Sequence, residues 1–128
     1  MKKNKKLLFL VNDLNFFVSH RLGIALSAVN KGLDVVIGYG ESGGFDPKSL
    51  KKKGLKVHFI PMNRGSINPI KELRTVFFIW KFFKKEKPDI VHLITIKPNI
   101  YGGIISLVTG VPALVSAISG LGTLFTSE

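Results

Sequence analysis

The distribution of apolar residues along this chain restricts its fold to the α/β class. Short, continuous apolar runs, each with the length of a strand buried on both faces, occur at residues 6–12, 33–37, 56–60, 89–94 and 112–117. Segments with helical periodicity lie between them, at residues 19–30, 47–53, 68–87 and 99–109. This alternation predicts a Rossmann-like, doubly wound parallel sheet with right-handed crossovers and the strand order 3-2-1-4-5.

Residue types at the ends of these segments predict where the helices begin and end. Asn68 and Pro69 provide a capping side chain and a first-turn proline at the start of the long helix. Gly32 follows the first helix, where a glycine commonly ends a helix. Residues 12–17 are predicted to form a loop, with Ser19 as the N-cap of the first helix.

The composition excludes several classes of protein. Because the chain has no cysteine, it has no disulfide framework, thiol nucleophile or cysteine-bound zinc. No apolar run reaches the roughly 18 residues that a membrane-spanning helix needs. The 128 residues include 19 Lys and Arg against 8 Asp and Glu, for a net charge of +11. This charge favours an anionic membrane surface as a partner; nucleic acid is not predicted, because no recognisable nucleic-acid-binding module accompanies the charge.

Polar residues follow the first and fourth predicted strands, which flank the point where the strand order reverses. Ligands of open α/β sheets bind at this point, beyond the carboxyl ends of the strands. The residues expected at the rim of such a crevice are Asn12, Asp13, Asn15, Thr95, Lys97 and Asn99. His20, in the first turn of the first predicted helix, is expected beside it, and an ordinary surface or packed histidine is the alternative interpretation. An ordinary strand-to-helix turn with a helix cap is the alternative interpretation of residues 95–99.

Two common cofactor signals are absent or incomplete. Residues 38–43 match G-x-G-x-x-G, but Asp46 and Pro47 prevent a helix from starting within the motif, and Asn63 stands where the acidic residue would be. The loop is therefore predicted to be flexible and not to bind a dinucleotide. No metal-ligand cluster is found, so neither a metal nor a resident cofactor is predicted. His92, inside an apolar strand, is predicted to be a core residue with its polar atoms satisfied.

The long helix at residues 68–87 combines apolar and cationic residues. A helical wheel predicts that one half faces the sheet, comprising Leu73, Val76, Phe77, Ile79, Trp80 and Phe83. The other half carries Lys71 together with Arg74, Phe78, Lys81, Phe82 and Lys85. Exposed aromatics between cations suit a helix lying in an anionic membrane interface. A protein contact or a second packed layer is the alternative.

Taken together, segments along almost the whole chain resemble the N-terminal, acceptor-side domain of GT-B glycosyltransferases of the family 4 type. The strongest matches are KPDIVH at 87–92, IKPNIYGG at 96–103, GVP at 110–112 and SGLG at 119–122. Weaker ones are FLV at 9–11, SHRL at 19–22, KGLDV at 31–35, GLKV at 54–57, IP at 60–61 and NPIKEL at 68–73. Bacterial enzymes that extend lipid-linked or surface polysaccharides show the greatest similarity.

The resemblance implies a retaining transfer of a sugar from a nucleotide-sugar to a lipid-linked glycan acceptor, usually without a metal. It implies that residues 12–18, His20, residues 95–99 and residues 119–122 line the acceptor side of the cleft, including Ser119 and Gly120. Arg21 and Lys97 are the cations expected to meet a lipid-linked diphosphate. The expected location is cytoplasmic, on the inner face of the cell membrane.

The chain also departs from the family pattern. Many relatives have His-x-His at the end of the fourth strand, whereas this chain has His92-Leu93-Ile94, so no catalytic histidine is assigned. The donor-binding domain is missing, and residues 1–128 are interpreted as one acceptor-side domain, incomplete at its C-terminus. We therefore expect no activity from the chain alone, which is interpreted as a truncated gene product, a fragment, or one subunit paired with a separate donor-domain polypeptide. The alternative function is a non-enzymatic membrane- or anion-binding α/β module.

Overall fold

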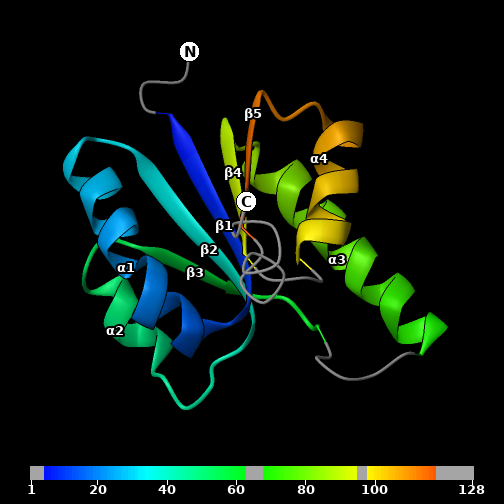
Figure 1. Ribbon diagram of the computed structural model, residues 1–128, viewed down its shortest axis with the longest axis horizontal. Helices are drawn as coiled ribbons and strands as arrows, with labels where there is room; N and C mark the ends of the chain where they lie inside the picture. Colours follow the sequence, from blue (N-terminus) through cyan, green and yellow to red (C-terminus); the bar gives the residue numbers. More distant parts are fainter. Residues whose placement is uncertain (1–4, 63–67, 95–97, 118–128) are drawn as a thin grey trace, which may run out of the picture.

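The protein forms a five-stranded, entirely parallel sheet in the order β3-β2-β1-β4-β5, as predicted (Figure 1). The computed structural model describes residues 5–62, 68–94 and 98–117. The strands are β1 (Lys6–Asp13), β2 (Asp34–Glu41), β3 (Lys56–Phe59), β4 (Ile90–Ile94) and β5 (Ala113–Ala117). All of them have their carboxyl ends at one edge of the sheet, because every pair is parallel.

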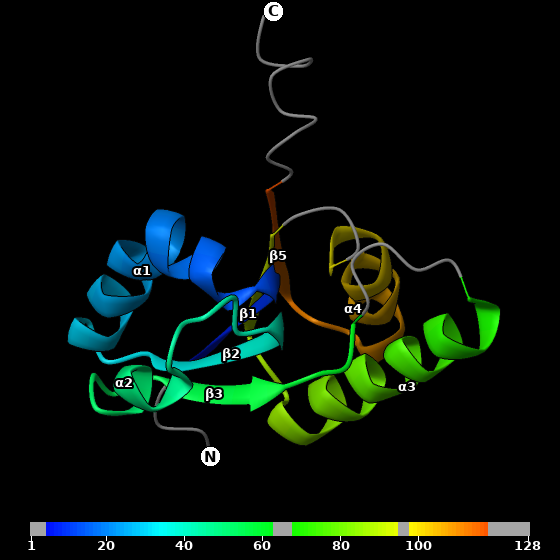
Figure 2. The ribbon, with the colours of Figure 1, turned by 90° about the horizontal axis from the view of Figure 1, so that it is seen from below.

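Helices cover both faces of this sheet. On one face lie α1 (Leu14–Asn30) and α2 (Pro47–Lys51). On the other lie α3 (Pro69–Glu86), a short π-helical turn η1 (Pro98–Gly102) and α4 (Gly103–Thr109). Figure 2 shows α3 and α4 side by side, with α1 on the opposite side of the sheet.

Alternate side chains of β1 divide the core into two clusters. Phe9 and Val11 join the cluster beneath α1, where the Phe9 ring lies 5.0 Å from the ring of Phe17. Leu8 and Leu10 join the cluster beneath α3. Because successive residues of a strand point to opposite faces, this continuous apolar strand is buried on both sides, as its sequence predicts.

The start of α1 differs from the prediction. The helix begins at Leu14, directly after β1, and Asp13 is its N-cap, accepting a hydrogen bond of 2.9 Å from the backbone N of Asn15. The predicted loop at 12–17 and the Ser19 cap are therefore wrong. The early start brings Phe17 onto Phe9, and this core contact outweighs the capping preference of Ser19. At the start of α3 the Asn68 cap and first-turn Pro69 are confirmed.

The orientation of α3 also differs from the prediction. The buried residues of the helix are Thr75, Ile79, Phe82 and Phe83. Phe82, which we expected on the exposed cationic half, is only 2% exposed and stacks against the His58 ring at 4.9 Å. Ile79 and Phe83 face the sheet as predicted, and Val76 is partly buried against the same cluster. Three residues that we expected to face the sheet are instead exposed: Leu73, Phe77 and Trp80.

The helix is therefore turned by about a quarter of a revolution from the predicted orientation. A helical wheel shows that α3 has two neighbouring apolar arcs, but periodicity alone does not say which of them faces the sheet. The arc of Ile79 and Phe83 packs on the sheet, while the arc of Leu73, Phe77 and Trp80 lies toward the outside.

Candidate functional site

The carboxyl edge of the sheet brings the first group of predicted site residues together. Asn12 and Asp13 end β1, and Asp13 lies in register with Glu41 at the end of β2. Asn15 stands in the first turn of α1. Asn99 lies in η1, beyond the end of β4, and its Nδ2 donates to the Leu93 carbonyl at 3.4 Å. Four other predicted residues lie outside the described residues: Thr95, Lys97, Ser119 and Gly120.

Asn12 is held deep in this edge. Its side chain is 8% exposed, and Oδ1 is buried with no hydrogen-bond partner among the described residues. Gly40 lies directly against it, because a Cβ at Gly40 would be 2.9 Å from Asn12 Oδ1 and 3.0 Å from the Met62 Cβ. The end of β2 thus packs against Asn12, and Gly43, just after this strand, lies against Asp13 and Asn15. The next helix begins only at Pro47, as predicted.

His20 lies farther from the N-terminus of α1 than the sequence analysis predicted. Because α1 starts at Leu14, His20 lies in the second helical turn and not at the helix N-terminus. Its ring stacks on Phe16 with centroids 4.2 Å apart, and Nδ1 lies 3.1 Å from the Phe16 carbonyl oxygen. The partial positive charge of the helix end therefore applies to Asn15 more than to His20.

Arg21 and His92 come together on the α1 face of the sheet. The His92 ring lies 5.1 Å from Phe9, and its Nε2 is buried without a hydrogen-bond partner among the described residues, so the predicted satisfied core histidine is wrong. Arg21 Nη1 donates to the His20 carbonyl at 3.3 Å. Burial lowers the pKa of His92 below its ordinary value, and the charge of Arg21 lowers it further. Both effects favour the neutral form of the His92 imidazole.

A cleft that we did not predict opens at the same edge of the sheet, between α3 and the ends of β2 and β3. Its volume is about 250 Å³, and its lining includes Gly40, Glu41, Phe59, Met62, Lys71 and Arg74. Lys71 and Arg74 stand one helical turn apart, which is the one signal in the sequence that could have indicated it. Another cleft, of about 270 Å³, lies beside Lys87 and Val111 at the opposite edge of the sheet, far from the strand ends where ligands bind.

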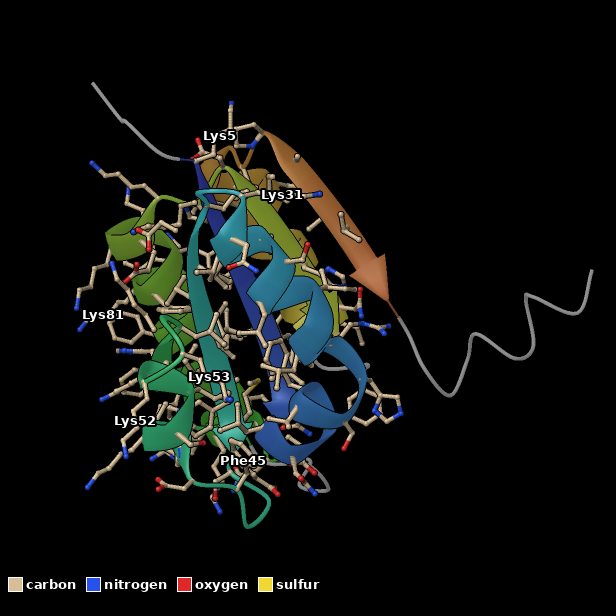
Figure 3. The ribbon with its side chains drawn as sticks, turned by 90° about the vertical axis from the view of Figure 1, so that its left-hand side faces the viewer. Lys5, Lys31, Phe45, Lys52, Lys53 and Lys81 are labelled. Atoms are coloured by element: carbon tan, nitrogen blue, oxygen red, sulfur yellow. The ribbon has the colours of Figure 1, made fainter. Side chains whose placement is uncertain are left out.

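A group of exposed apolar side chains lies on α3 and α4, which pack side by side. We call it the α3–α4 patch, and its residues are Ile70, Leu73, Phe77, Trp80, Ile104, Leu107 and Val108. Lysines border it: Lys81 Nζ lies 5.4 Å from the Phe77 ring centroid, and Lys84 Nζ lies 5.9 Å from that of Trp80. In Figure 3, Lys81 and Lys52 project outward on the same side of the molecule. An apolar surface with a cationic border favours an anionic, amphipathic partner.

Two kinds of feature are missing from the part of the chain that the structure describes. Within it, no three His, Asp or Glu side chains are grouped so that they could hold a metal ion. No helix among the same residues is long and apolar enough to cross a bilayer.

Comparison with known proteins identifies relatives of the chain. Residues 6–128 match the family described as glycosyl transferase 4-like. Over 66 residues the chain is 35% identical to the Escherichia coli UDP-Gal:alpha-D-GlcNAc-diphosphoundecaprenol alpha-1,3-galactosyltransferase, covering 52% of this chain and 17% of that protein. The chain thus matches about a sixth of the length of this relative.

Solved structures share the fold. Acinetobacter baumannii MurG superposes with a TM-score of 0.68 at 21% identity, covering 88% of this chain and 35% of MurG. A glycosyltransferase from Rickettsia africae gives a TM-score of 0.64 at 22% identity, covering 88% of this chain and 29% of that protein. At such identities the likeness concerns the fold, which is that of one Rossmann-like half of a GT-B protein.

Proposed function

Because the chain belongs to the glycosyl transferase 4-like family, we propose that it is the acceptor-binding N-terminal portion of a retaining glycosyltransferase. Its substrates are a nucleotide-sugar donor and a lipid-linked or surface polysaccharide acceptor. The observation that carries the proposal is the family match over residues 6–128. The partial match to an enzyme named for a diphosphoundecaprenol-linked acceptor supports the lipid-linked class.

The carboxyl edge of the sheet is the proposed acceptor side. Asn12, Asp13 and Asn15 gather there with Asn99, and amide and carboxylate groups are suited to hydrogen-bond sugar hydroxyls. Thr95, Lys97, Ser119 and Gly120 are proposed to complete this side. Of the two cations first expected to meet the diphosphate, Arg21 lies on α1, where it bonds the His20 carbonyl and its charge acts on His92, so of this pair only Lys97 remains a candidate.

Sugar transfer needs a donor held in line with the acceptor hydroxyl, and correct placement supplies much of the rate enhancement. In the proposed enzyme the donor occupies a second domain, absent from residues 1–128. We therefore propose that this chain binds acceptor and does not transfer sugar by itself.

The α3–α4 patch is the proposed contact with the membrane, on the inner face of the cell membrane. Leu107 and Leu73 are 82% and 71% exposed, so both can enter the interface without disturbing the core. Arg74, Lys81 and Lys85 lie on the adjacent exposed arc of α3, and each cation near anionic lipid contributes about 1 kcal/mol. Phe78, 37% exposed, lies within this arc, whereas the buried Phe82 has no part in the contact.

The test measures binding of two ligands to the purified chain. One is an N-acetylglucosamine diphosphate carrying a short alkyl chain, which imitates a lipid-linked acceptor; the other is UDP-galactose. We expect saturable binding of the acceptor analogue, little binding of UDP-galactose, and no sugar transfer when both are present.

Each contrary result has a specific meaning. Binding to anionic vesicles with no affinity for the acceptor analogue would favour the non-enzymatic membrane- or anion-binding module, to which the high net charge also points. Sugar transfer by the chain alone would refute the proposed need for a second domain.

A further inference from the structure

The cleft between α3 and the ends of β2 and β3 contains two cations that have no anionic partner in the part of the chain that the structure describes. Lys71 and Arg74 both line it and both side chains are exposed. Within residues 5–62, 68–94 and 98–117, neither of these two side chains forms an ion pair, in contrast to Lys6 and Lys56. Glu41, on the opposite wall, forms no ion pair with them either. The cleft therefore presents unneutralised positive charge to a ligand.

The helical turn that carries these cations is firmly positioned. Asn68 Oδ1 accepts hydrogen bonds from the backbone N of Ile70 at 3.0 Å and of Lys71 at 3.4 Å. The buried Thr75 Oγ1 donates to the Pro61 carbonyl at 2.7 Å, joining α3 to the segment that follows β3. Such a fixed backbone reduces the entropy lost when the cations engage a ligand.

The chemistry of the walls suits a diphosphate attached to a sugar. Arg74 can bind phosphate oxygens through two parallel N–H bonds, and Lys71 adds a second charge one turn away. The Phe59 ring, 58% exposed, offers an apolar face to a sugar ring. Glu41 can accept hydrogen bonds from sugar hydroxyls.

The position of the cleft, between the α3–α4 patch and the rim of the sheet, determines how a bound ligand would be oriented. Ile70 and Leu73, which belong to the α3–α4 patch, are 78% and 71% exposed and are the immediate sequence neighbours of the two cations. On the other side, Glu41 is in register with Asp13 at the rim. The α3–α4 patch, the two cations and the rim thus lie in a row. A lipid-linked acceptor has its lipid, diphosphate and sugar in the same order.

Building on the proposed function, we infer that Lys71 and Arg74, in place of Lys97, bind the diphosphate of the lipid-linked acceptor in this cleft. Arg21 is a poorer candidate, because it lies on the opposite face of the sheet from the α3–α4 patch. The lipid would lie along Ile70 and Leu73, and the first sugar would extend past Phe59 toward the rim.

The inference is tested by titrating the ¹⁵N-labelled chain with geranyl diphosphate and, separately, with inorganic pyrophosphate. We expect both to shift the amide resonances of residues 40–41, 59–62 and 70–75, with geranyl diphosphate binding more tightly because its chain contacts the patch. The double variant Lys71→Gln/Arg74→Gln should bind geranyl diphosphate at least about tenfold more weakly.

The matched control is Lys5→Gln/Lys31→Gln, which removes the same charge from two exposed lysines that precede β1 and follow α1, outside the cleft and the proposed membrane contact. Its affinity should stay within about twofold of the unchanged chain in 0.15 M salt, where distant charges are screened. Equal losses in both double variants, no loss in either, or shifts centred on Arg21 would each overturn the inference. If the acceptor analogue binds normally to Lys71→Gln/Arg74→Gln, this inference fails while the proposed function stands; if it does not bind the unchanged chain, the proposed function itself fails.

Discussion

The Tyr101 hydroxyl donates a hydrogen bond to the Glu72 carboxylate and so joins η1 to the first turn of α3. Because α4 continues directly from η1, this bond helps to set the position of α4 beside α3. The two helices carry the two halves of the α3–α4 patch. The continuity of that surface thus depends partly on a polar contact between residues 29 positions apart in the chain.

The same bond predicts an unusual titration. Hydrogen bonding to Glu72, followed by burial and by the carboxylate charge, raises the pKa of Tyr101 to about 12. In a Tyr39→Phe variant, where Tyr101 is the remaining tyrosine, phenolate absorbance should show a midpoint near pH 12. Adding Glu72→Gln should move that midpoint downward, and an unmoved midpoint would contradict this cause.

The direction of the effect on stability follows from linkage. The folded-state pKa of Tyr101 is above the ordinary value of 10.0, so the fold favours the protonated phenol. The contribution is complete below pH 10 and is lost as the pH rises toward about 12. Difference measurements of unfolding free energy between the unchanged chain and Tyr101→Phe should decline across this window.

Phe78 and Phe82, one helical turn apart, should respond very differently to truncation. Phe82 is 2% exposed, so Phe82→Ala leaves a cavity and should lower the free energy of unfolding by about 3–5 kcal/mol. Phe78 is 37% exposed, and Phe78→Ala should lower it by about 1 kcal/mol or less. Urea denaturation measures both, and similarly small losses in the two variants would mean that α3 has the orientation predicted from its helical wheel.

The α3–α4 patch should govern binding to anionic vesicles. Leu73→Ser with Leu107→Ser removes two exposed apolar side chains, and binding to vesicles of mixed phosphatidylglycerol and phosphatidylcholine should weaken at least about tenfold. Ile24→Ser is the control, because Ile24 is 50% exposed on α1, on the other side of the sheet. Co-sedimentation distinguishes the two variants, and an equal loss in both would count against the patch.

Gly40 and Gly23 offer opposite outcomes for the same substitution. Gly40→Ala places a methyl group 2.9 Å from Asn12 Oδ1 and 3.0 Å from Met62 Cβ, so it should destabilise the fold by about 1–3 kcal/mol. A Cβ at Gly23 meets nothing within 4 Å, and alanine suits a helix interior, so Gly23→Ala should stabilise by up to about 1 kcal/mol. Thermal unfolding of the two variants gives the comparison; a destabilised Gly23→Ala would argue against the position of α1.

Local sequence signals predicted the ends of elements well only where no tertiary contact competed. Asn68 and Pro69 start α3 as expected, because capping and a fixed φ act within one helical turn. At the start of α1 the local preference of Ser19 was overruled, since Asp13 can cap the helix one turn and a half earlier and thereby bring Phe17 onto Phe9.

The candidate site likewise has features that the sequence predicted and features that only the structure revealed. The sequence placed Asn12, Asp13 and Asn99 at one edge because parallel strands end together. It did not reveal the cleft, which needs Glu41, Phe59 and Arg74 from three different elements. Nor did it reveal that the charge of Arg21 acts on the pKa of His92, because that depends on how α1 crosses the sheet.

By itself, then, the sequence determined the α/β class, the parallel sheet and its order, because burial of apolar strands and the handedness of crossovers leave few alternatives. Only the tertiary structure decided which arc of α3 faces the sheet. Both arcs are apolar enough to be buried, and the choice followed from how the sheet, η1 and α4 pack around the helix. That choice placed Leu73, Phe77 and Trp80 on the surface and Lys71 and Arg74 in the cleft, so the proposed membrane and diphosphate contacts both depend on packing that no local pattern encodes.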